Sequence, residues 1–193
     1  DIPVTKKDAE ELNFYKPDED SEELIYLRQR REALGGYLPS RDFELEKFNI
    51  PKLEVFKPLL GSSGKKEMSS TKAFVRFLSL LIRDKELGPR VVPIVPDEAR
   101  TFGMEGLFRQ MGIYSSSGQL YEPEDSDTVM WYKEDKKGQV LQEGINEAGA
   151  ISDWIAAATS YASHNVTMIP FYIYYSKFGF QRVGDLAWAA GDM

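Results

Sequence analysis

Cysteine is absent from the sequence, and histidine occurs only once, as His164. The lack of cysteine excludes disulfide bonds, thiolate metal sites, iron–sulfur clusters and a cysteine nucleophile. One histidine excludes a metal site built from several histidines of this chain, and any Ser-His-Asp triad would have to use His164. We expect His164 to interact with the C-terminal end of its helix rather than to act in catalysis.

Positive charge is also in short supply, with 24 Lys and Arg against 31 Asp and Glu and a net charge of −7. An acidic chain lacks the basic surface of a general nucleic-acid binder. The apolar runs are shorter than the roughly 18 residues that span a membrane, so we expect neither nucleic acid nor membrane as a partner. The lack of cysteine permits a cytoplasmic location, which we also expect.

The composition of the chain changes near residue 65. Residues 1–65 form a charged lead-in, in which Ser21 is placed to cap a helix over 22–34 that ends at the following glycine pair. After this helix, residues 37–60 alternate proline with isolated apolar residues, which predicts an extended segment lying across another surface. The chain therefore divides into a lead-in over 1–65 and a second part over 66–193.

The second part alternates predicted helices and strands. Strands are expected over 90–96, 139–145 and 168–176, and helical segments over 71–87, 105–114, 146–164 and from 178 onward. This order is typical of an α/β fold with a parallel sheet. The strand over 168–176 is almost entirely apolar and aromatic, which predicts burial on both faces. The polar segment 115–137 is long enough to predict either a lid over a site or a disordered segment.

Ligands of open parallel sheets bind at the carboxyl ends of the strands. One such end carries Asp97 and Glu98, which could cap a helix, hold a metal or act as an acid and a base. Another carries Glu143 and Glu147, either of which could be functional, although a carboxylate that opens a helix is often only a dipole partner. The third carries the aromatic residues over 172–180, which could equally be core.

Three blocks carry a resemblance to a known family: VPIVPDEARTFGMEGLFRQMGIY, YKEDKKGQVLQEGINEAGA and IPFYIYYSKFGFQRVGDLAWAAGD. Their order and spacing resemble the homodimeric, bacterial-type decarboxylating component of the pyruvate dehydrogenase complex, and the resemblance covers essentially the whole chain. It implies the parallel-sheet thiamine diphosphate-binding fold, specifically the transketolase-like module that holds the aminopyrimidine. It also implies an enzyme that decarboxylates pyruvate and reductively acetylates the lipoyl group of an acyltransferase component.

The resemblance also implies the cofactors and the site residues. Thiamine diphosphate and Mg²⁺ are held in this family between two modules at a subunit interface, so a second subunit of a homodimer is an implied partner. Glu147 in QEGINEAGA matches the cofactor-activating glutamate, for which we expect partial burial and a raised pKa. Tyr175 and Phe178 match aromatic positions beside the aminopyrimidine, and Asp97 and Glu98 match acidic positions near the active centre.

The family's metal motif, Gly-Asp-Gly followed later by Asn, does not occur in this sequence. We therefore expect the ligands of the metal and the diphosphate to lie outside the chain, and the 193 residues alone to be inactive. The ending Ala-Gly-Asp-Met suggests a module truncated at its C-terminus. Two alternatives stay open: a related thiamine-dependent enzyme acting on another 2-oxo acid or on a sugar, and a domain that serves only interaction or dimerisation.

Overall fold

The computed structural model describes residues 3–36, 45–96, 99–124 and 132–193. The chain divides into two compact units, Asp1–Arg41 and Asp42–Met193. The boundary expected near residue 65 stays a prediction, because compactness divides a chain by packing and not by function. No helix among the described residues combines the length and the apolar character needed to cross a lipid bilayer.

The first unit contains two helices, α1 (Lys6–Glu11) and α2 (Glu22–Ala33). The Ser21 hydroxyl accepts a hydrogen bond from the Leu24 amide at 3.4 Å, which caps α2 as the sequence predicts. Gly35 and Gly36 follow with φ of 95° and 119°, a backbone conformation that ends a helix readily only at glycine. Neither helix buries a residue, so the described part of this unit, residues 3–36, adds no core of its own.

The second unit is built on a three-stranded parallel sheet in the order β4-β1-β5. Its strands are β1 (Val91–Val95), β4 (Leu141–Gln142) and β5 (Ile169–Tyr172). A second parallel pair joins β2 (Ile113–Tyr114) to β3 (Glu134–Asp135). The predicted α/β class with parallel strands is thus confirmed. Burial of β5 on both faces was a wrong prediction: all four of its residues are half-buried, because β1 is its only neighbour in this sheet.

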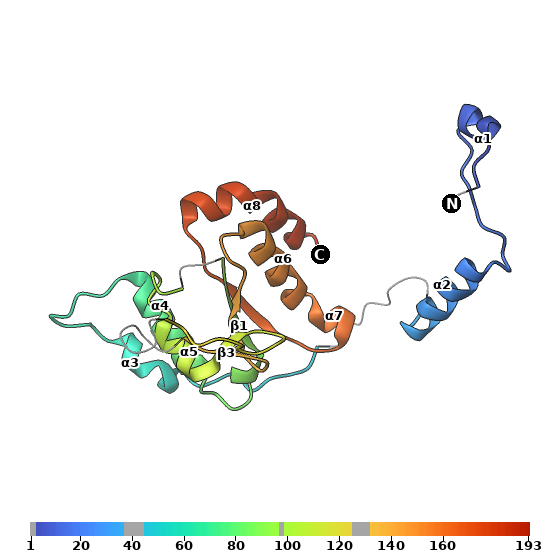
Figure 1. Ribbon diagram of the computed structural model, residues 1–193. Helices are drawn as coiled ribbons and strands as arrows, with labels where there is room; N and C mark the ends of the chain where they lie inside the picture. Colours follow the sequence, from blue (N-terminus) through green and yellow to red (C-terminus); the bar gives the residue numbers. More distant parts are fainter. Residues whose placement is uncertain (1–2, 37–44, 97–98, 125–131) are drawn as a thin grey trace. The chain divides into compact units, whose positions relative to one another are not determined.

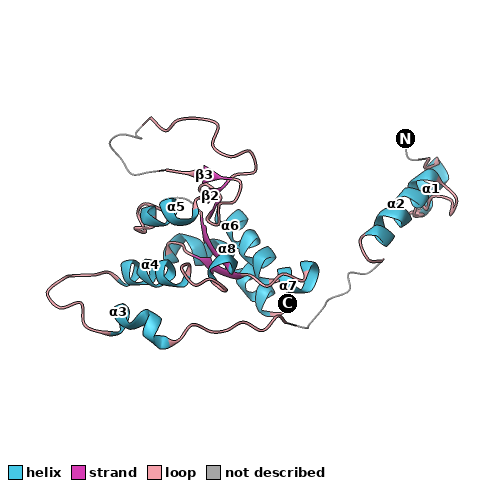
Figure 2. Ribbon diagram, turned by 90° about the horizontal axis from the view of Figure 1, so that it is seen from below, coloured by secondary structure: helices cyan, strands magenta, loops and turns pink. Residues whose placement is uncertain are grey.

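Helices cover both faces of this sheet (Figure 1). The helices among the described residues of this unit are η1 (Leu53–Phe56), α3 (Lys57–Leu60), α4 (Ser70–Leu81), η2 (Gly88–Arg90), α5 (Glu105–Met111), α6 (Glu147–Ala158), α7 (Ser160–His164) and α8 (Ser176–Gly191). Helices α4 and α5 lie on one side of β1, and the adjacent pair α6 and α8 lies on the other (Figures 1 and 2). The result is a layered α/β/α arrangement around β1.

The helix boundaries depart from the sequence expectation where side chains bond to the backbone. Helix α4 ends at Leu81 rather than continuing to residue 87, because the Asp84 carboxylate accepts hydrogen bonds from the amides of Glu86 (2.9 Å) and Leu87 (2.8 Å). The helix expected over 146–164 is divided at Thr159 into α6 and α7. Helix α8 begins at Ser176, two residues before the predicted start.

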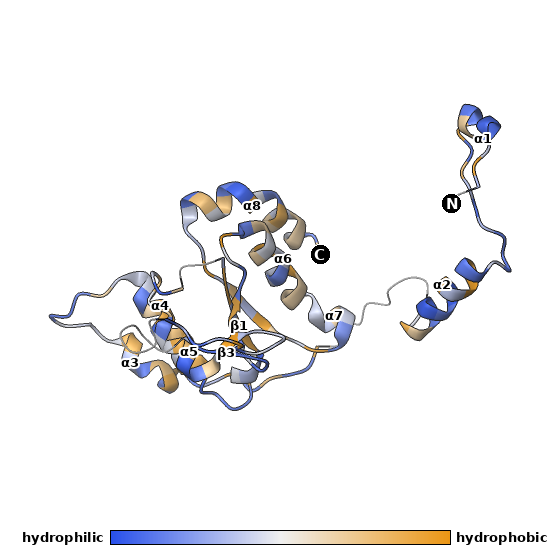
Figure 3. Cartoon of the chain, in the orientation of Figure 1, coloured by the Kyte–Doolittle hydropathy of each residue, from blue (hydrophilic) through white to orange (hydrophobic). Residues whose placement is uncertain are grey.

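The core lies between α4, β1 and α5. The side chains of Leu78, Val91, Val95 and Leu107 are fully buried there, and β1 is coloured as hydrophobic in Figure 3. Of the face predicted for α4, Leu78 and Leu81 are buried, whereas Phe74 and Phe77 pack against the core while partly exposed.

The segment before α4 belongs to the same packing unit. Phe56 stacks on Phe77 at 5.1 Å between ring centroids, and Arg90 lies 5.6 Å from the centre of the Phe48 ring. The backbone and side-chain amides of Asn49 both donate to the carboxylate of Glu86, each at 2.9 Å. These two bonds lower the pKa of Glu86. The predicted extended segment lying across another surface is therefore confirmed for residues 45–52. For residues 53–60 it was wrong, because they form η1 and α3, and Pro58 fits the first turn of α3 without breaking it.

We expect Glu86→Gln to loosen this segment, because an amide cannot accept both hydrogen bonds from Asn49 as a carboxylate does. Trypsin should cleave faster after Lys47 and Lys52 in the variant, while Glu54→Gln, an exposed change nearby, should leave cleavage unchanged. Since the pKa of Glu86 is lowered, its contribution is present above the ordinary glutamate pKa and is lost as the pH falls through the lowered value. Equal cleavage rates in both variants would contradict the assignment.

Candidate functional site

Two of the three strand ends that the sequence singled out can be followed in the structure. Strands β4 and β5 flank β1 in parallel, so the segments that leave them start from the same edge of the sheet. Glu147 lies in the first turn of α6 after β4, and Tyr175 directly precedes α8 after β5. Asp97 and Glu98, predicted at the end of β1, lie outside the described residues.

Glu147 is placed by the cap of α6. The side-chain oxygen of Asn146 accepts a hydrogen bond from the Gly149 amide at 3.0 Å, which fixes the first turn of the helix. The Glu147 side chain is only 12% exposed, and its Oε1 accepts a hydrogen bond from Nη1 of Arg182 at 2.7 Å. An ion pair with these contacts favours the charged form of the carboxylate.

The pKa of Glu147 is lowered, chiefly by the hydrogen bond from Arg182. The sequence-based expectation was partial burial with a raised pKa. The burial is present, but the cation shifts the pKa in the opposite direction. In the described chain Glu147 is therefore held as a carboxylate, ready to accept a hydrogen bond rather than to donate one.

Arg182 is the residue of this site that sequence reasoning missed. Its guanidinium contacts Glu147 and also lies 5.2 Å from the centre of the Phe178 ring, four residues earlier on α8. Phe178 and Glu147 are thus brought together through one arginine. The spacing in FGFQR places Phe178 and Arg182 on one helix face, a usable signal. Nothing in the sequence links that face to Glu147, 35 residues away.

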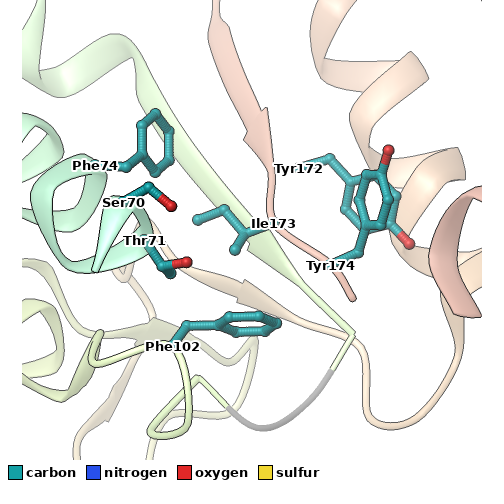
Figure 4. A pocket seen from close by; sticks show the side chains of 7 residues that line it. All are labelled: Ser70, Thr71, Phe74, Phe102, Tyr172, Ile173 and Tyr174. Carbon is teal, nitrogen blue, oxygen red and sulfur yellow. The ribbon is translucent and has the colours of Figure 1, made fainter. Parts of the chain in front are cut away.

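Two tyrosines of β5 and its extension line the same region. Tyr172 and Tyr174 stack at 4.7 Å between ring centroids, and Figure 4 shows both rings on the opposite side of the strand from Ile173. The Tyr172 hydroxyl donates to the backbone oxygen of Glu147 at 3.4 Å. Burial raises the pKa of Tyr172 to about 12, with a further contribution from the charge of Glu147. Tyr172 therefore stays protonated and acts as a donor.

Tyr175 meets a different neighbour. Its ring lies 4.8 Å from that of Phe102, between centroids, at an interplanar angle of 38°. Phe102 also lines a cavity of about 340 Å³, together with Phe74, Ile173 and residues at the start of α4 (Figure 4). The predicted site residues thus form two groups, Glu147 with Phe178 at Arg182, and Tyr175 against Phe102.

Glu143, the alternative to Glu147, has another environment. It faces Asp153 of α6, whose pKa is raised to about 6 by burial and by the hydrogen bond and charge of the Glu143 carboxyl group. A carboxyl group that faces a second acid and a carboxylate bound to a cation are different chemical environments. The choice of Glu147 rather than Glu143 as the functional acid stays a prediction. The two carboxyl groups have different neighbours, so substitution of each can be compared.

The described residues show no cluster of metal-ligating side chains. Among the residues that the structure describes, no group of three or more His, Asp or Glu side chains could hold a metal ion. His164 lies in the last turn of α7, where its Nδ1 is 2.8 Å from the Ser163 hydroxyl. This placement confirms the expected position at a helix C-terminus.

The described ends of the segment 115–137 are held in place. The hydroxyl groups of Tyr121 and Tyr132 donate to the same oxygen of Glu134, at 2.8 and 3.1 Å. The Glu134 amide donates to the side-chain oxygen of Gln119 at 3.0 Å. Residues 125–131 of this segment lie outside the described residues, so a lid over the site stays a prediction.

We expect Arg182→Gln to raise the pKa of Glu147 toward the ordinary glutamate value of 4.5, because the charged hydrogen bond that lowers it is lost. The matched control is Lys177→Gln, which removes an exposed cation from the same helix. Titration of the Glu147 carboxyl carbon by NMR measures both variants. A Glu147 pKa that is the same in Arg182→Gln as in the parent chain would show that this ion pair does not form in solution.

Comparison with known proteins places these features in a family. The family model described as "Pyruvate dehydrogenase E1 component middle domain" matches residues 48–193. Proteins named pyruvate dehydrogenase E1 component are 66% identical in Pseudomonas aeruginosa over 192 residues, 60% in Cupriavidus necator over 193 and 57% in Escherichia coli K12 over 192. These alignments cover 99–100% of this chain but only 22% of each relative. The chain belongs to the family of the pyruvate dehydrogenase E1 component middle domain.

Proposed function

We propose that this chain forms the aminopyrimidine-binding part of a thiamine diphosphate-dependent pyruvate dehydrogenase. The observation that carries the proposal is the carboxylate of Glu147, fixed in the first turn of α6 at the carboxyl edge of a parallel sheet. The family to which the chain belongs and the names of its relatives, pyruvate dehydrogenase E1 component, support this reaction class. The fold we propose is correspondingly the thiamine diphosphate-binding fold of transketolase-like enzymes.

The chemistry of the described residues fits an aminopyrimidine. An ionised, largely buried carboxylate is a strong acceptor for the N–H of a protonated ring nitrogen. Phe178 and Tyr175 are 50% and 39% exposed, which leaves aromatic surface available for stacking on a flat ring. Because the Gly-Asp-Gly…Asn motif of the family does not occur in this sequence, we propose that the ligands of the metal and of the diphosphate lie outside this chain.

Each residue has a proposed task in this site. Glu147 holds a proton at the pyrimidine ring nitrogen, and Tyr175 and Phe178 orient the ring. When bound, thiamine diphosphate supplies the nucleophile and the electron sink that decarboxylation of a 2-oxo acid requires. Asp97 and Glu98 are proposed as acidic groups near the reacting atoms, and the segment 115–137 as the cover that excludes water.

The proposed partners follow from the same assignment. They are pyruvate, a second subunit that completes the site, and the lipoyl-bearing acyltransferase component that accepts the acetyl group. The net charge of −7 disfavours nucleic acid as a partner. A cytoplasmic location is part of the proposal and is supported by the lack of cysteine and by the bacterial relatives.

In the full-length enzyme that contains this chain, we expect Glu147→Gln to lower the rate of pyruvate decarboxylation by at least about 100-fold, since an amide cannot hold the ring proton. The matched control is Glu143→Gln, which changes the neighbouring carboxylate and should retain the rate within a few-fold. Carbon dioxide release measures both. If Glu143→Gln were the inactive variant and Glu147→Gln the active one, the functional acid would be Glu143.

We expect the isolated 193 residues to release no carbon dioxide from pyruvate above background, even with thiamine diphosphate and Mg²⁺ present. The reason is that the sequence lacks the metal motif of the family and spans only 22% of the relatives it matches. Addition of a polypeptide carrying the diphosphate module should restore turnover. Decarboxylation by the chain alone would contradict the proposed division of the site.

A further inference from the structure

We propose that Phe102 is a positioning residue that sets the orientation of the Tyr175 ring. This inference rests on the proposed function, which places Tyr175 beside the aminopyrimidine. The two rings are in contact at 4.8 Å between centroids, tilted by 38°. They come from different parts of the fold: Phe102 from the connection between β1 and α5, and Tyr175 from the junction of β5 and α8.

The backbone of Tyr175 is fixed by the start of α8. Its carbonyl oxygen accepts hydrogen bonds from the amides of Phe178 at 3.0 Å and Gly179 at 2.7 Å. The preceding residue, Tyr174, packs so closely on Gly179 that a Cβ atom there would lie 2.1 Å from the Tyr174 ring. The Cα of Tyr175 therefore has a defined place, and its ring is 39% exposed.

Phe102 provides a fixed surface for that ring. It is 8% exposed and is flanked by the buried residues Ala99 and Met104. The connection is closed by backbone hydrogen bonds from Gly103 to Arg100 and from Met104 to Ala99, both 2.9 Å. Gly103 has a φ of +71°, a conformation that glycine adopts without strain. Because Phe102 is buried and Tyr175 is the more exposed partner of this ring contact, Phe102 constrains the Tyr175 ring rather than the reverse.

The contact between Phe102 and Tyr175 has a consequence for catalysis. A ring beside the reacting centre contributes only when it is held in the productive orientation, and small displacements can lower rates by up to about 100-fold. Phe102 would act through Tyr175 and without touching substrate or cofactor itself. Its removal should therefore lower kcat only while Tyr175 is present.

A double-mutant cycle in the full-length enzyme, loaded with thiamine diphosphate and Mg²⁺, tests this inference. The variants are Phe102→Leu, Tyr175→Ala and the two together, with Phe102→Tyr as the variant that keeps an aromatic ring. We expect Phe102→Leu to lower kcat by about 10-fold with a smaller change in KM, Phe102→Tyr to retain most of kcat, and Phe102→Leu to have no further effect on Tyr175→Ala.

Phe77→Leu serves as the matched control, because Phe77 is a core aromatic that stacks on Phe56 and Phe74. It should lower the midpoint of urea unfolding as Phe102→Leu does, yet leave kcat unchanged. If Phe102→Leu does not fold, Phe102→Met takes its place in the cycle, since methionine fills a similar volume without a ring.

The outcomes separate this inference from the proposed function. An equal loss of kcat on Phe102→Leu in the parent and in Tyr175→Ala would overturn the positioning role and leave a structural one. An unchanged kcat in Tyr175→Ala, with Glu147→Gln inactive, would also overturn it, because Tyr175 would then have no task for Phe102 to support. Full activity of Glu147→Gln would instead refute the proposed function.

Discussion

The site depends on two backbone hydrogen bonds made by β1. The Ile94 carbonyl accepts from the amide of Ile173, at 2.9 Å, and the Val95 carbonyl accepts from the amide of Glu143, at 3.2 Å. The central strand thereby extends its pairing one residue beyond β4 and beyond β5, on opposite sides. The segments that carry Glu147 and Tyr175 leave the sheet from these two points, and both are therefore placed by one strand. The β1 side chains Val91 and Val95 are fully buried, which ties the position of the site to the main core.

Local signals in the sequence predicted the parts of the fold that are determined locally. Ser21 caps its helix as predicted, and Ser69 caps α4 in the same way, because a hydroxyl three residues before a free amide is a short-range interaction. Parallel pairing also followed from the order of helices and strands. The half-buried state of β5 did not follow, since its apolar sequence describes what the strand could bury, and its neighbours decide what it does bury.

The same distinction explains the site. Glu147 could be identified by a resemblance and placed by its helix start, but its protonation state depends on Arg182, which lies 35 residues later on α8. No periodicity reports a contact between the start of one helix and the side of another. The Phe102 and Tyr175 stack has the same character, because 73 residues separate its two members (175 − 102). Sequence patterns assign residues to faces, whereas packing of α6 on α8 decides which faces meet.

The lowered pKa of Glu147 shows what assembly of a complete enzyme would have to change. Glutamate and a ring nitrogen share a proton well only when their proton affinities are similar, and a bound arginine makes the carboxylate the weaker base. The Arg182 side chain is 54% exposed, so solvent now stabilises the charge of the guanidinium. A second polypeptide laid over this surface would remove that water and raise the pKa of Glu147 unless the ion pair tightened in compensation. The protonation of the proposed catalytic acid is therefore controlled by what covers α8, which is consistent with a site completed at an interface.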